Sequence, residues 1–434
     1  MTRHQLPPLV RLLTAASATA VPLLGLLAVS APPATAAPAA GEDTGDQCQY
    51  PAKPYEGRPW ALQRVLLDEL WKQSTGKGVR VAVIDSGVDV KNKQLTPAVD
   101  TRSGLNALPK GIKDEQGTPI ERGKEDGTTD TVGHGTKVAG IIAARPLRGT
   151  GFVGLAPDAT IIPIQQNDAE GHGDAVTLAT AIDHAVASRA KVINISQDTA
   201  NATRPTPVLE RAVERALTRG IVIVASAGND GLGGNVKQTY PASYPGVLAV
   251  AASDRNNERA AFSQSGEFVG VAAPGVDMVS TVPGGGHCAD NGTSFSAPYV
   301  AGVAALIRSK HPDWTRQQVV TQIQQTAERA VPAHDRLVGW GVVDPVRALT
   351  EDEHTPPPAP VAGGGLTGVH APTAAELPVG ETPQERDARL GTYVMVGGGV
   401  LVAAIAGAAV AVRDGRRRSR ATTVVTPHGG ARSQ

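Results

Sequence analysis

Short runs of apolar, mostly β-branched residues recur through the middle of the 434-residue chain and alternate with longer stretches of mixed polarity. Runs of this kind are typical of strands that are buried on both faces of a sheet. We therefore predict strands at five places: Val79–Ile84, Thr160–Ile164, Lys191–Ser196, Ile221–Ala225 and Val247–Ala252.

Two of the stretches between these runs carry apolar residues at a helical spacing. They predict helices at about Ala175–Ser188 and Val208–Arg219, and Gly220 is placed to end the second helix. A repeated strand, helix, strand order is typical of a parallel sheet with helices on both faces. The sequence therefore predicts an α/β fold of this type, in which functional groups gather at the carboxyl ends of the strands.

The two ends of the chain carry apolar segments of a different kind. The first, around Leu12 to Val29, follows a basic N-terminus and precedes the small residues Ala34-Thr35-Ala36. A basic start, an apolar centre and a small-residue cleavage site are typical of an export signal. We predict a signal peptide at residues 1–36; the alternative, an uncleaved membrane anchor, would also require export.

The second apolar segment, Tyr393 to Val412, is uncharged over its 20 residues. As a helix it is about 30 Å long, which matches the hydrocarbon core of a bilayer. We predict a transmembrane helix at 393–412 and a basic cytoplasmic tail at 413–434, because arginines hold this side of a span in the cytoplasm. These arginines are Arg413, Arg416, Arg417, Arg418 and Arg420. Everything before Tyr393 is then extracytoplasmic.

Composition divides the rest of the chain. Residues 351–390 are rich in Pro, Gly and Ala and lack periodicity, which is typical of a linker. Residues 37–59 lie between the predicted signal and the first predicted structure, and they are too few to form a domain. A folded domain at residues 60–350 remains.

Charge and cysteine content narrow the possible partners. The chain has 41 basic and 41 acidic residues, and its formal net charge of zero argues against a nucleic acid as partner. It contains two cysteines, Cys48 and Cys288. An exported location favours a disulfide between them, with two free thiols or bonds to a partner as alternatives.

Polar residues with possible chemistry follow two of the predicted strands. Asp85 comes directly after the first strand, and Asn229 follows the fourth. His134 stands between two glycines at the start of a predicted helix. Glycines on both sides let neighbouring backbone approach closely and leave the imidazole accessible.

The stretch NGTSFSAPYVAG adds two serines, Ser294 and Ser296, at the start of another helix. Each polar residue also has an ordinary explanation, because serine caps helices, asparagine is frequent in turns and a lone histidine is usually a surface residue. Taken together, however, Asp85, His134 and Ser294 follow one another in the chain order of the subtilisin triad, with Asn229 before the serine.

The motifs around these residues resemble those of the subtilisin family (S8) of serine proteases. They read VAVIDSGV around Asp85, DTVGHGTKVAG around His134, ASAGND around Asn229 and NGTSFSAPYVAGVAAL around Ser294. The resemblance covers roughly Trp60 to Thr350. The segments GFVGLAPDATIIPIQQN and GWGVVDP, the linker and the C-terminal span are in addition similar to mycosins, the proteases of actinobacterial type VII secretion.

The resemblance implies a role for each of these residues. His134 would take the hydroxyl proton of Ser294, Asp85 would fix the tautomer of His134, and Asn229 with the Ser294 backbone N–H would hold the oxyanion. Ser296 would then be a polar residue of the first helical turn. No cofactor is implied. Subtilisins often bind calcium, but the polar segment from Lys91 to Asp130 lacks recognisable ligand spacing, so we predict a solvated loop and no metal site.

Two features depart from the family pattern. Where many subtilisins have Ser-Leu-Gly along the cleft, this chain reads Ser196-Gln197-Asp198. A polar wall would suit a narrow substrate set, but these side chains could equally point to solvent. Residues 37–59 are too short for the usual pro-domain, so we expect an arm lying on the catalytic domain, secured by Cys48, with an open active site.

The resemblance implies a membrane-anchored extracytoplasmic serine endopeptidase that cleaves a limited set of exported proteins beside a type VII secretion membrane complex. One alternative is a structural part of that complex in which catalysis is secondary. The stripe of small residues Gly399, Ala403, Gly407 and Ala411 in the span favours such assembly. Another alternative is a general cell-surface protease that degrades peptides.

Overall fold

The computed structural model describes residues 48–111, 122–168, 173–196, 204–234, 238–362 and 383–421. The predicted signal peptide at 1–36 lies outside these residues, as do parts of the predicted arm, linker and tail. The chain forms two compact units, Met1–Ala362 and Gly363–Gln434.

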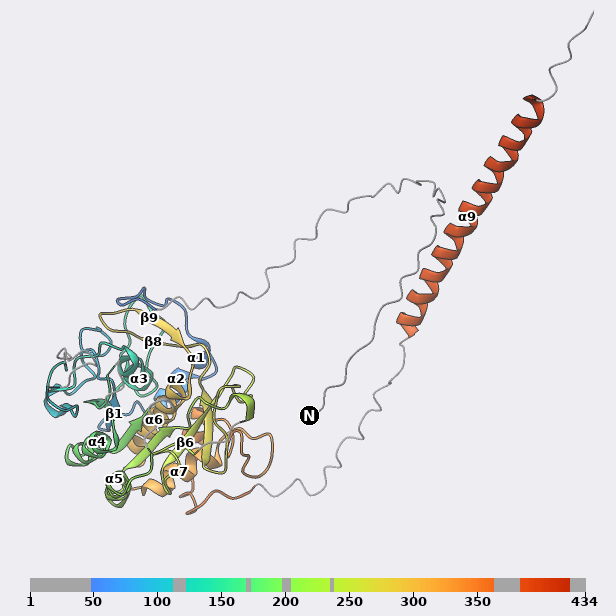
Figure 1. Cartoon of the computed structure of the whole chain (residues 1–434). Helices are drawn as coiled ribbons and strands as arrows, with labels where there is room; N and C mark the ends of the chain where they lie inside the picture. Colours follow the sequence, from blue (N-terminus) through green and yellow to red (C-terminus); the bar gives the residue numbers. More distant parts are fainter. Residues whose placement is uncertain are drawn as a thin grey trace, which may run out of the picture. The chain divides into compact units, whose positions relative to one another are not determined.

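A parallel sheet forms the centre of the first unit, and Figure 1 labels two of its strands, β1 and β6. The sheet has seven strands in the order β2-β3-β1-β4-β5-β6-β7. Its strands are β1 (Arg80–Asp85), β2 (Leu105–Asn106), β3 (Thr160–Gln165), β4 (Val192–Ile195), β5 (Val222–Ser226), β6 (Leu248–Ser253) and β7 (Val269–Pro274). The α/β fold with a parallel sheet is confirmed, and each of the five predicted strands is present within one residue of its expected bounds.

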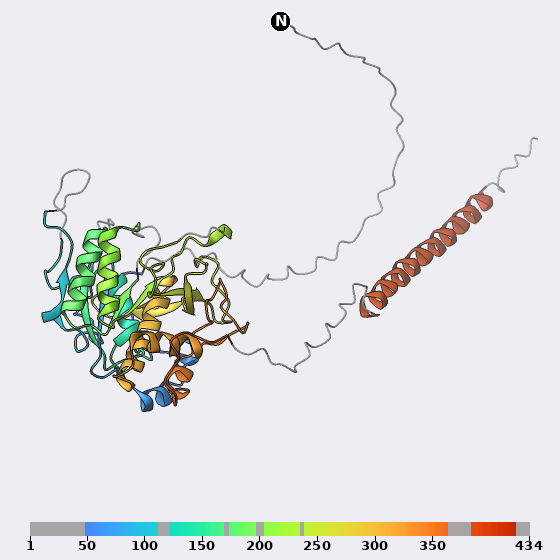
Figure 2. The same cartoon turned by 90° about the horizontal axis from the view of Figure 1, so that it is seen from below.

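Helices cover both faces of this sheet, and two separate cores result. On one face α4 (Ala175–Ala187) and α5 (Pro207–Thr218) lie side by side, as Figure 2 shows in green. On the other face lie α3 (His134–Ala143) and α6 (Thr293–Lys310). The sheet contributes alternate residues to the two cores: Val81 and Val83 to the second, Ala82 and Ile84 to the first.

Shorter helices pack around the second face. They are α1 (Trp60–Gln63), α2 (Leu67–Gln73), α7 (Arg316–Gln325) and α8 (Pro345–Thr350). Both α7 and α8 begin with a polar cap: the Thr315 hydroxyl accepts from the Gln318 N–H, and the Asp344 carboxylate accepts from the Val346 and Arg347 N–H groups. These caps satisfy donors that a helix start leaves unpaired.

An antiparallel hairpin, β8 (Met278–Thr281) and β9 (His287–Asp290), connects the sheet to α6. The described part of the N-terminal arm, residues 48–59, runs along this hairpin. The Ala52 N–H donates to the Gly285 carbonyl (3.0 Å), and the His287 N–H donates to the Lys53 carbonyl (3.1 Å). The sequence pattern did not predict this hairpin.

The segment from Lys91 to Asp130 is not wholly a solvated loop. Its first half supplies the edge strand β2 and buries Leu95 and Leu108. The Asn106 amide, which is also buried, donates to the side-chain oxygen of Gln165 in β3 (2.7 Å). Residues 112–121 of this segment lie outside the described part of the chain.

The described residues of the second unit form one helix, α9 (Pro383–Ala421). Its stretch Gln384–Arg418 is long and apolar enough to cross a membrane, with a mean hydropathy of 2.2 in its apolar window. The predicted span at 393–412 lies within this stretch.

The face of α3 toward β8 leaves no room at Gly140. The Ser280 and Thr281 hydroxyls of β8 donate to the carbonyls of Lys137 (2.6 Å) and Thr136 (2.9 Å) in α3. A Cβ on Gly140 would overlap both hydroxyls. Glycine at this helical position therefore permits the contact between α3 and the hairpin.

We predict that Gly140→Ala lowers the free energy of unfolding by about 1–3 kcal/mol, the usual cost of overpacking, although alanine normally stabilises a helix relative to glycine. Urea denaturation measures the change. In the variant Gly140→Ala/Thr281→Ala the closer of the two hydroxyls is gone, so the added methyl group costs less there than in the original chain when the double variant is compared with Thr281→Ala. A single variant as stable as the original chain would contradict the prediction.

Candidate active site

Asp85 is the last residue of β1, the strand that lies between β3 and β4 in the sheet. The chain passes from β1 toward one edge and returns to the other side of β1 at β4, so the carboxyl end of β1 lies at the point where strand order reverses. Parallel sheets form their functional crevices at such points. The Asp85 side chain is buried, and its Oδ1 accepts a hydrogen bond from the Ser86 N–H (2.8 Å).

His134 is the first residue of α3, and the two glycines beside it have distinct structural reasons. Gly133 has φ +82°, a backbone conformation that favours glycine, and a Cβ there would overlap the Tyr50 ring. A Cβ on Gly135 would overlap the Gly87 carbonyl oxygen. The close backbone approach that the sequence suggested is therefore present at Gly135, whereas at Gly133 the close neighbour is an aromatic side chain.

Asp130 holds the loop that leads into His134. Its carboxylate is buried and accepts four hydrogen bonds: from the Gly133 N–H (2.7 Å), the Ser86 hydroxyl (2.9 Å), the Thr136 N–H (2.8 Å) and the Thr136 hydroxyl (2.5 Å). The Ser86 hydroxyl in turn accepts from the Gly135 N–H (2.9 Å). Burial raises the pKa of Asp130 to about 6, so the carboxylate is ionised at neutral pH.

Asp85 and His134 meet although 49 residues separate them. The Nδ1 atom of His134 lies 2.7 Å from Oδ1 of Asp85. Burial disfavours the charged imidazole, but the Asp85 carboxylate, with smaller contributions from Asp130 and Asp290, outweighs this effect and raises the pKa of His134 above its ordinary value. Because the carboxylate only accepts, Nδ1 carries the proton and Nε2 of the neutral ring is left as the basic atom.

Ser294 is the second residue of α6, and its side chain is buried. The next residue, Phe295, packs its ring against the His134 imidazole, with 5.3 Å between the ring centroids. The structure thus brings the start of α6 to the start of α3. Ser296 lies on the inner side of the helix, and its buried hydroxyl has no hydrogen-bond partner among the described residues.

Asn229 follows β5 and is tied to the same end of α6. Its Oδ1 accepts from the N–H (2.9 Å) and the hydroxyl (3.0 Å) of Thr293. The Thr293 hydroxyl also accepts from the Gly228 N–H (3.1 Å). Because both Thr293 donors face Oδ1, the amide orientation is fixed and Nδ2 turns the other way, beside Gly292.

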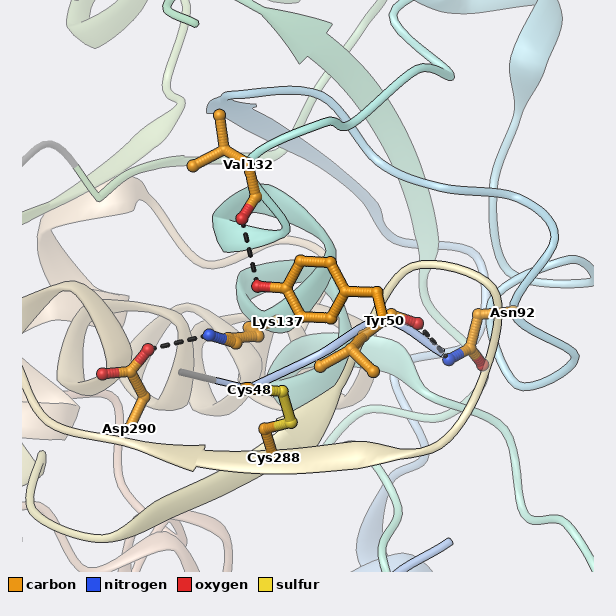
Figure 3. The surroundings of a disulfide bond; sticks show 8 residues. Cys48, Tyr50, Asn92, Val132, Lys137, Cys288 and Asp290 are labelled. Atoms are coloured by element: carbon orange, nitrogen blue, oxygen red, sulfur yellow. Dashed lines mark hydrogen bonds and ion pairs between the residues drawn. A yellow bond between two sulfur atoms is a disulfide. The ribbon is translucent and has the colours of Figure 1, made fainter. Parts of the chain in front are cut away.

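The Cys48 and Cys288 sulfurs are joined in a disulfide that links the arm to β9, with 6.1 Å between the two Cα atoms (Figure 3). The bond closes a loop of 240 residues. It therefore attaches the N-terminal arm to the hairpin that runs directly into α6.

Sequence reasoning identified Asp85, His134, Asn229 and Ser294 but missed the polar residues that hold them. Asp130 and Thr293 lie inside the quoted motifs, beside the residues that were singled out. Only their multiple buried donors and acceptors distinguish them from ordinary loop and capping residues. In the described part of the chain no group of three or more His, Cys, Asp or Glu side chains is placed to hold a metal ion. Gln197 and Asp198 of the expected cleft wall lie outside it.

Comparison with known proteins relates this arrangement to one family. A sequence profile described as Subtilase family, Peptidase S8, matches residues 76–341. Subtilisin E from Bacillus subtilis (strain 168) is 38% identical over 271 residues, which are 62% of this chain and 66% of the length of Subtilisin E.

Two solved structures are similar over most of the first unit. The structure of MycP3 protease from the type VII (ESX-3) secretion system is 35% identical, with a TM-score of 0.59, and the match covers 70% of this chain and 90% of that one. A structure of MycP1 is 32% identical, with a TM-score of 0.56 over 69% of this chain and 90% of that one. That MycP1 is described as a serine protease and an essential component of the type VII (ESX-1) secretion system.

We predict that Asp130→Asn destabilises the loop before His134. An amide can accept hydrogen bonds at one atom only, so its NH2 group would face two N–H or O–H donors. The expected loss is about 1–3 kcal/mol in the free energy of unfolding, measured by urea denaturation.

Asp126→Asn is the matched control, because one Asp126 oxygen takes both bonds from Thr128 and an amide oxygen can replace it. We expect a change within about 0.5 kcal/mol for this variant. Equal losses for the two variants would mean that the Asp130 network does not hold the loop.

Proposed function

The chain belongs to the subtilase family, and from this membership we propose that it is a serine endopeptidase in which Asp85, His134 and Ser294 form the catalytic triad. The observation that carries the proposal is the 2.7 Å contact between Asp85 and His134 beside the start of the Ser294 helix. Residues from three distant motifs meet there, and they are of the types that peptide hydrolysis by a serine nucleophile requires.

In the proposed reaction the Ser294 oxygen forms a bond to the peptide carbonyl carbon, and His134 Nε2 takes the hydroxyl proton. When the tetrahedral intermediate collapses, the C–N bond breaks and His134 returns the proton to the leaving amine. Water then repeats both steps on the acyl-enzyme and releases the second product. Asp85 keeps the proton on Nδ1 and stabilises the imidazolium that forms.

The proposed base works only when it is neutral. Asp85 raises the pKa of His134, so the imidazole loses its proton at a higher pH than an ordinary histidine does. The rate is therefore expected to rise with pH over that higher pH range. The same shift strengthens the base once it is neutral. The Asp85 carboxylate thus contributes both to the higher pH that the reaction needs and to the greater basicity of the neutral imidazole.

The oxyanion would be held by the Asn229 Nδ2 group and the Ser294 N–H. The orientation of the Asn229 amide supports this role, because Thr293 occupies its oxygen and leaves the donor end turned toward the backbone before Ser294. The start of α6 adds the positive end of a helix dipole.

We further propose that the enzyme is exported and held in the cell membrane by the span at 393–412, with residues 413–434 in the cytoplasm. The domain limits follow the sequence pattern: signal peptide at 1–36, arm at 37–59, peptidase domain at 60–350 and linker at 351–390. The length and apolarity of α9 support the anchor, and the arginines after the span support the orientation.

The likeness to MycP3 and MycP1 supports the proposal that the enzyme acts next to a type VII secretion complex and cleaves a limited set of exported proteins there. The description of MycP1 as an essential component of such a system favours a second candidate, a structural part in which catalysis is secondary. A single substitution that removes only chemistry separates these functions.

We predict that Asn229→Ala slows reaction with a fluorophosphonate probe, which modifies an activated serine, about 10²–10³-fold; this is the loss known for the same change in subtilisin itself. The measurement is the labelling rate of the full chain in detergent, with the modified residue located by mass spectrometry. Asn256→Ala, at an exposed loop position, should label at the original rate. Equal rates for the two variants would remove Asn229 from the oxyanion site.

We predict that Ser294→Ala abolishes processing of exported proteins while the chain remains in the membrane. Exported proteins of a deletion strain are compared by mass spectrometry after complementation with the original chain or with Ser294→Ala. Ser296→Ala is the matched control and should restore every cleavage. If Ser294→Ala restores both secretion and all cut termini, the protease proposal is wrong; if it restores secretion alone, the structural role is primary.

A further inference from the structure

Tyr50 of the arm lies on the backbone that leads into His134. Its hydroxyl donates to the Val132 carbonyl (3.1 Å), across 82 residues of sequence. Its ring covers Gly133, where a Cβ would overlap it. Figure 3 shows the hydroxyl pointing at Val132. A residue from outside the sheet therefore touches both residues that precede the proposed base.

Lys137 lies beneath the same ring, one turn after His134 in α3. Its ammonium group is 5.9 Å from the centre of the Tyr50 ring and forms an ion pair with Asp290 of β9 (2.8 Å). The Lys137 side chain is 8% exposed, whereas the Asp290 side chain is 41% exposed, so the pair lies at the edge of the buried region with its lysine enclosed. Burial disfavours the ammonium, but Asp290 outweighs it and raises the pKa of Lys137. The lysine thus stays charged between the arm and the hairpin.

The arm holds Tyr50 from both sides. Two residues before it, Cys48 is bonded to Cys288. Just after it, Ala52 and Lys53 form backbone hydrogen bonds with the hairpin at Gly285 and His287. The disulfide and these bonds fix Tyr50 to β9, which ends at Asp290, four residues before Ser294.

The Tyr50 contacts complement those on the inner side of the loop. On the inner side, Asp130 accepts hydrogen bonds from the Gly133 N–H and the Thr136 N–H. On the outer side, the Tyr50 hydroxyl donates to the Val132 carbonyl. A loop held only from the inside could still shift outward at Val132. Tyr50 prevents that shift. Because Tyr50 is itself fixed to the hairpin, it holds the loop in one position relative to the hairpin that precedes Ser294.

We propose that Tyr50 is a positioning residue for His134, and that the Cys48–Cys288 disulfide and the Lys137–Asp290 ion pair keep it in place, so that the arm aligns the base with the serine nucleophile. This inference rests on the proposed function. It assigns the arm a part in the chemical step, in addition to any part in stability.

The test is Tyr50→Phe in the full chain, which removes the hydroxyl and keeps the ring. Reaction with the fluorophosphonate probe is followed at several probe concentrations, to separate the limiting rate constant from probe binding. We expect the limiting rate constant to fall about fivefold, within the net worth of one hydrogen bond, while probe binding stays unchanged and the thermal midpoint falls by no more than the loss of one such bond explains. Cys48→Ser/Cys288→Ser, which frees the arm, should lose at least as much.

Tyr55→Phe is the matched control, because Tyr55 lies in the same arm and the residue is 42% exposed. It should react at the original rate. If Tyr50→Phe reacts as fast as Tyr55→Phe at every pH, or if it loses rate only at temperatures where it is partly unfolded, the positioning role is wrong while the triad stands. If the original chain does not react at Ser294 at all, the proposed function itself has failed.

Discussion

Burial of α6 is the constraint on which the rest of the structure depends. Residues Thr293 to Arg308 are all buried, so this helix is surrounded by the sheet on one side and by α3, α7 and α8 on the others. A helix enclosed in this way needs small side chains where neighbours approach, and Gly302 lies close against Leu155 for that reason. It cannot tilt or slide without opening cavities, so Ser294 at its first turn has one position.

The sheet brings the other groups to that position. Parallel strands end at one edge, and β1 and β5 deliver Asp85 and the Gly228-Asn229 turn there. Polar contacts then replace apolar packing: Thr293 ties Asn229 to α6, and Asp130 ties the His134 loop to Ser86. Apolar packing determines where the elements lie, and buried hydrogen bonds determine how the side chains point, since such bonds are costly to leave unmade.

These two kinds of interaction explain what the sequence could predict. Strands buried on both faces are continuous apolar runs, so five of them were located within one residue, whereas the edge strand β2 has two residues and no pattern of its own. The β8–β9 hairpin mixes polar and apolar residues and depends on pairing with the arm. Asp85, His134, Asn229 and Ser294 were singled out because their order and neighbours match a family, and their catalytic roles stay a prediction. The disulfide between Cys48 and Cys288 could be predicted because the chain contains only these two cysteines.

The residues that sequence reasoning missed are defined by contacts, not by neighbours in the chain. Ser86 binds Asp130 across 44 residues, Thr293 binds Asn229 across 64, and Tyr50 binds Val132 across 82. A lone tyrosine or threonine carries no pattern from which such a partner could be read. Their common property is that each holds a backbone group or side chain next to a proposed catalytic residue. A base and a nucleophile on separate helices need such contacts, because a small shift between α3 and α6 would lengthen the path of the proton that must pass between them.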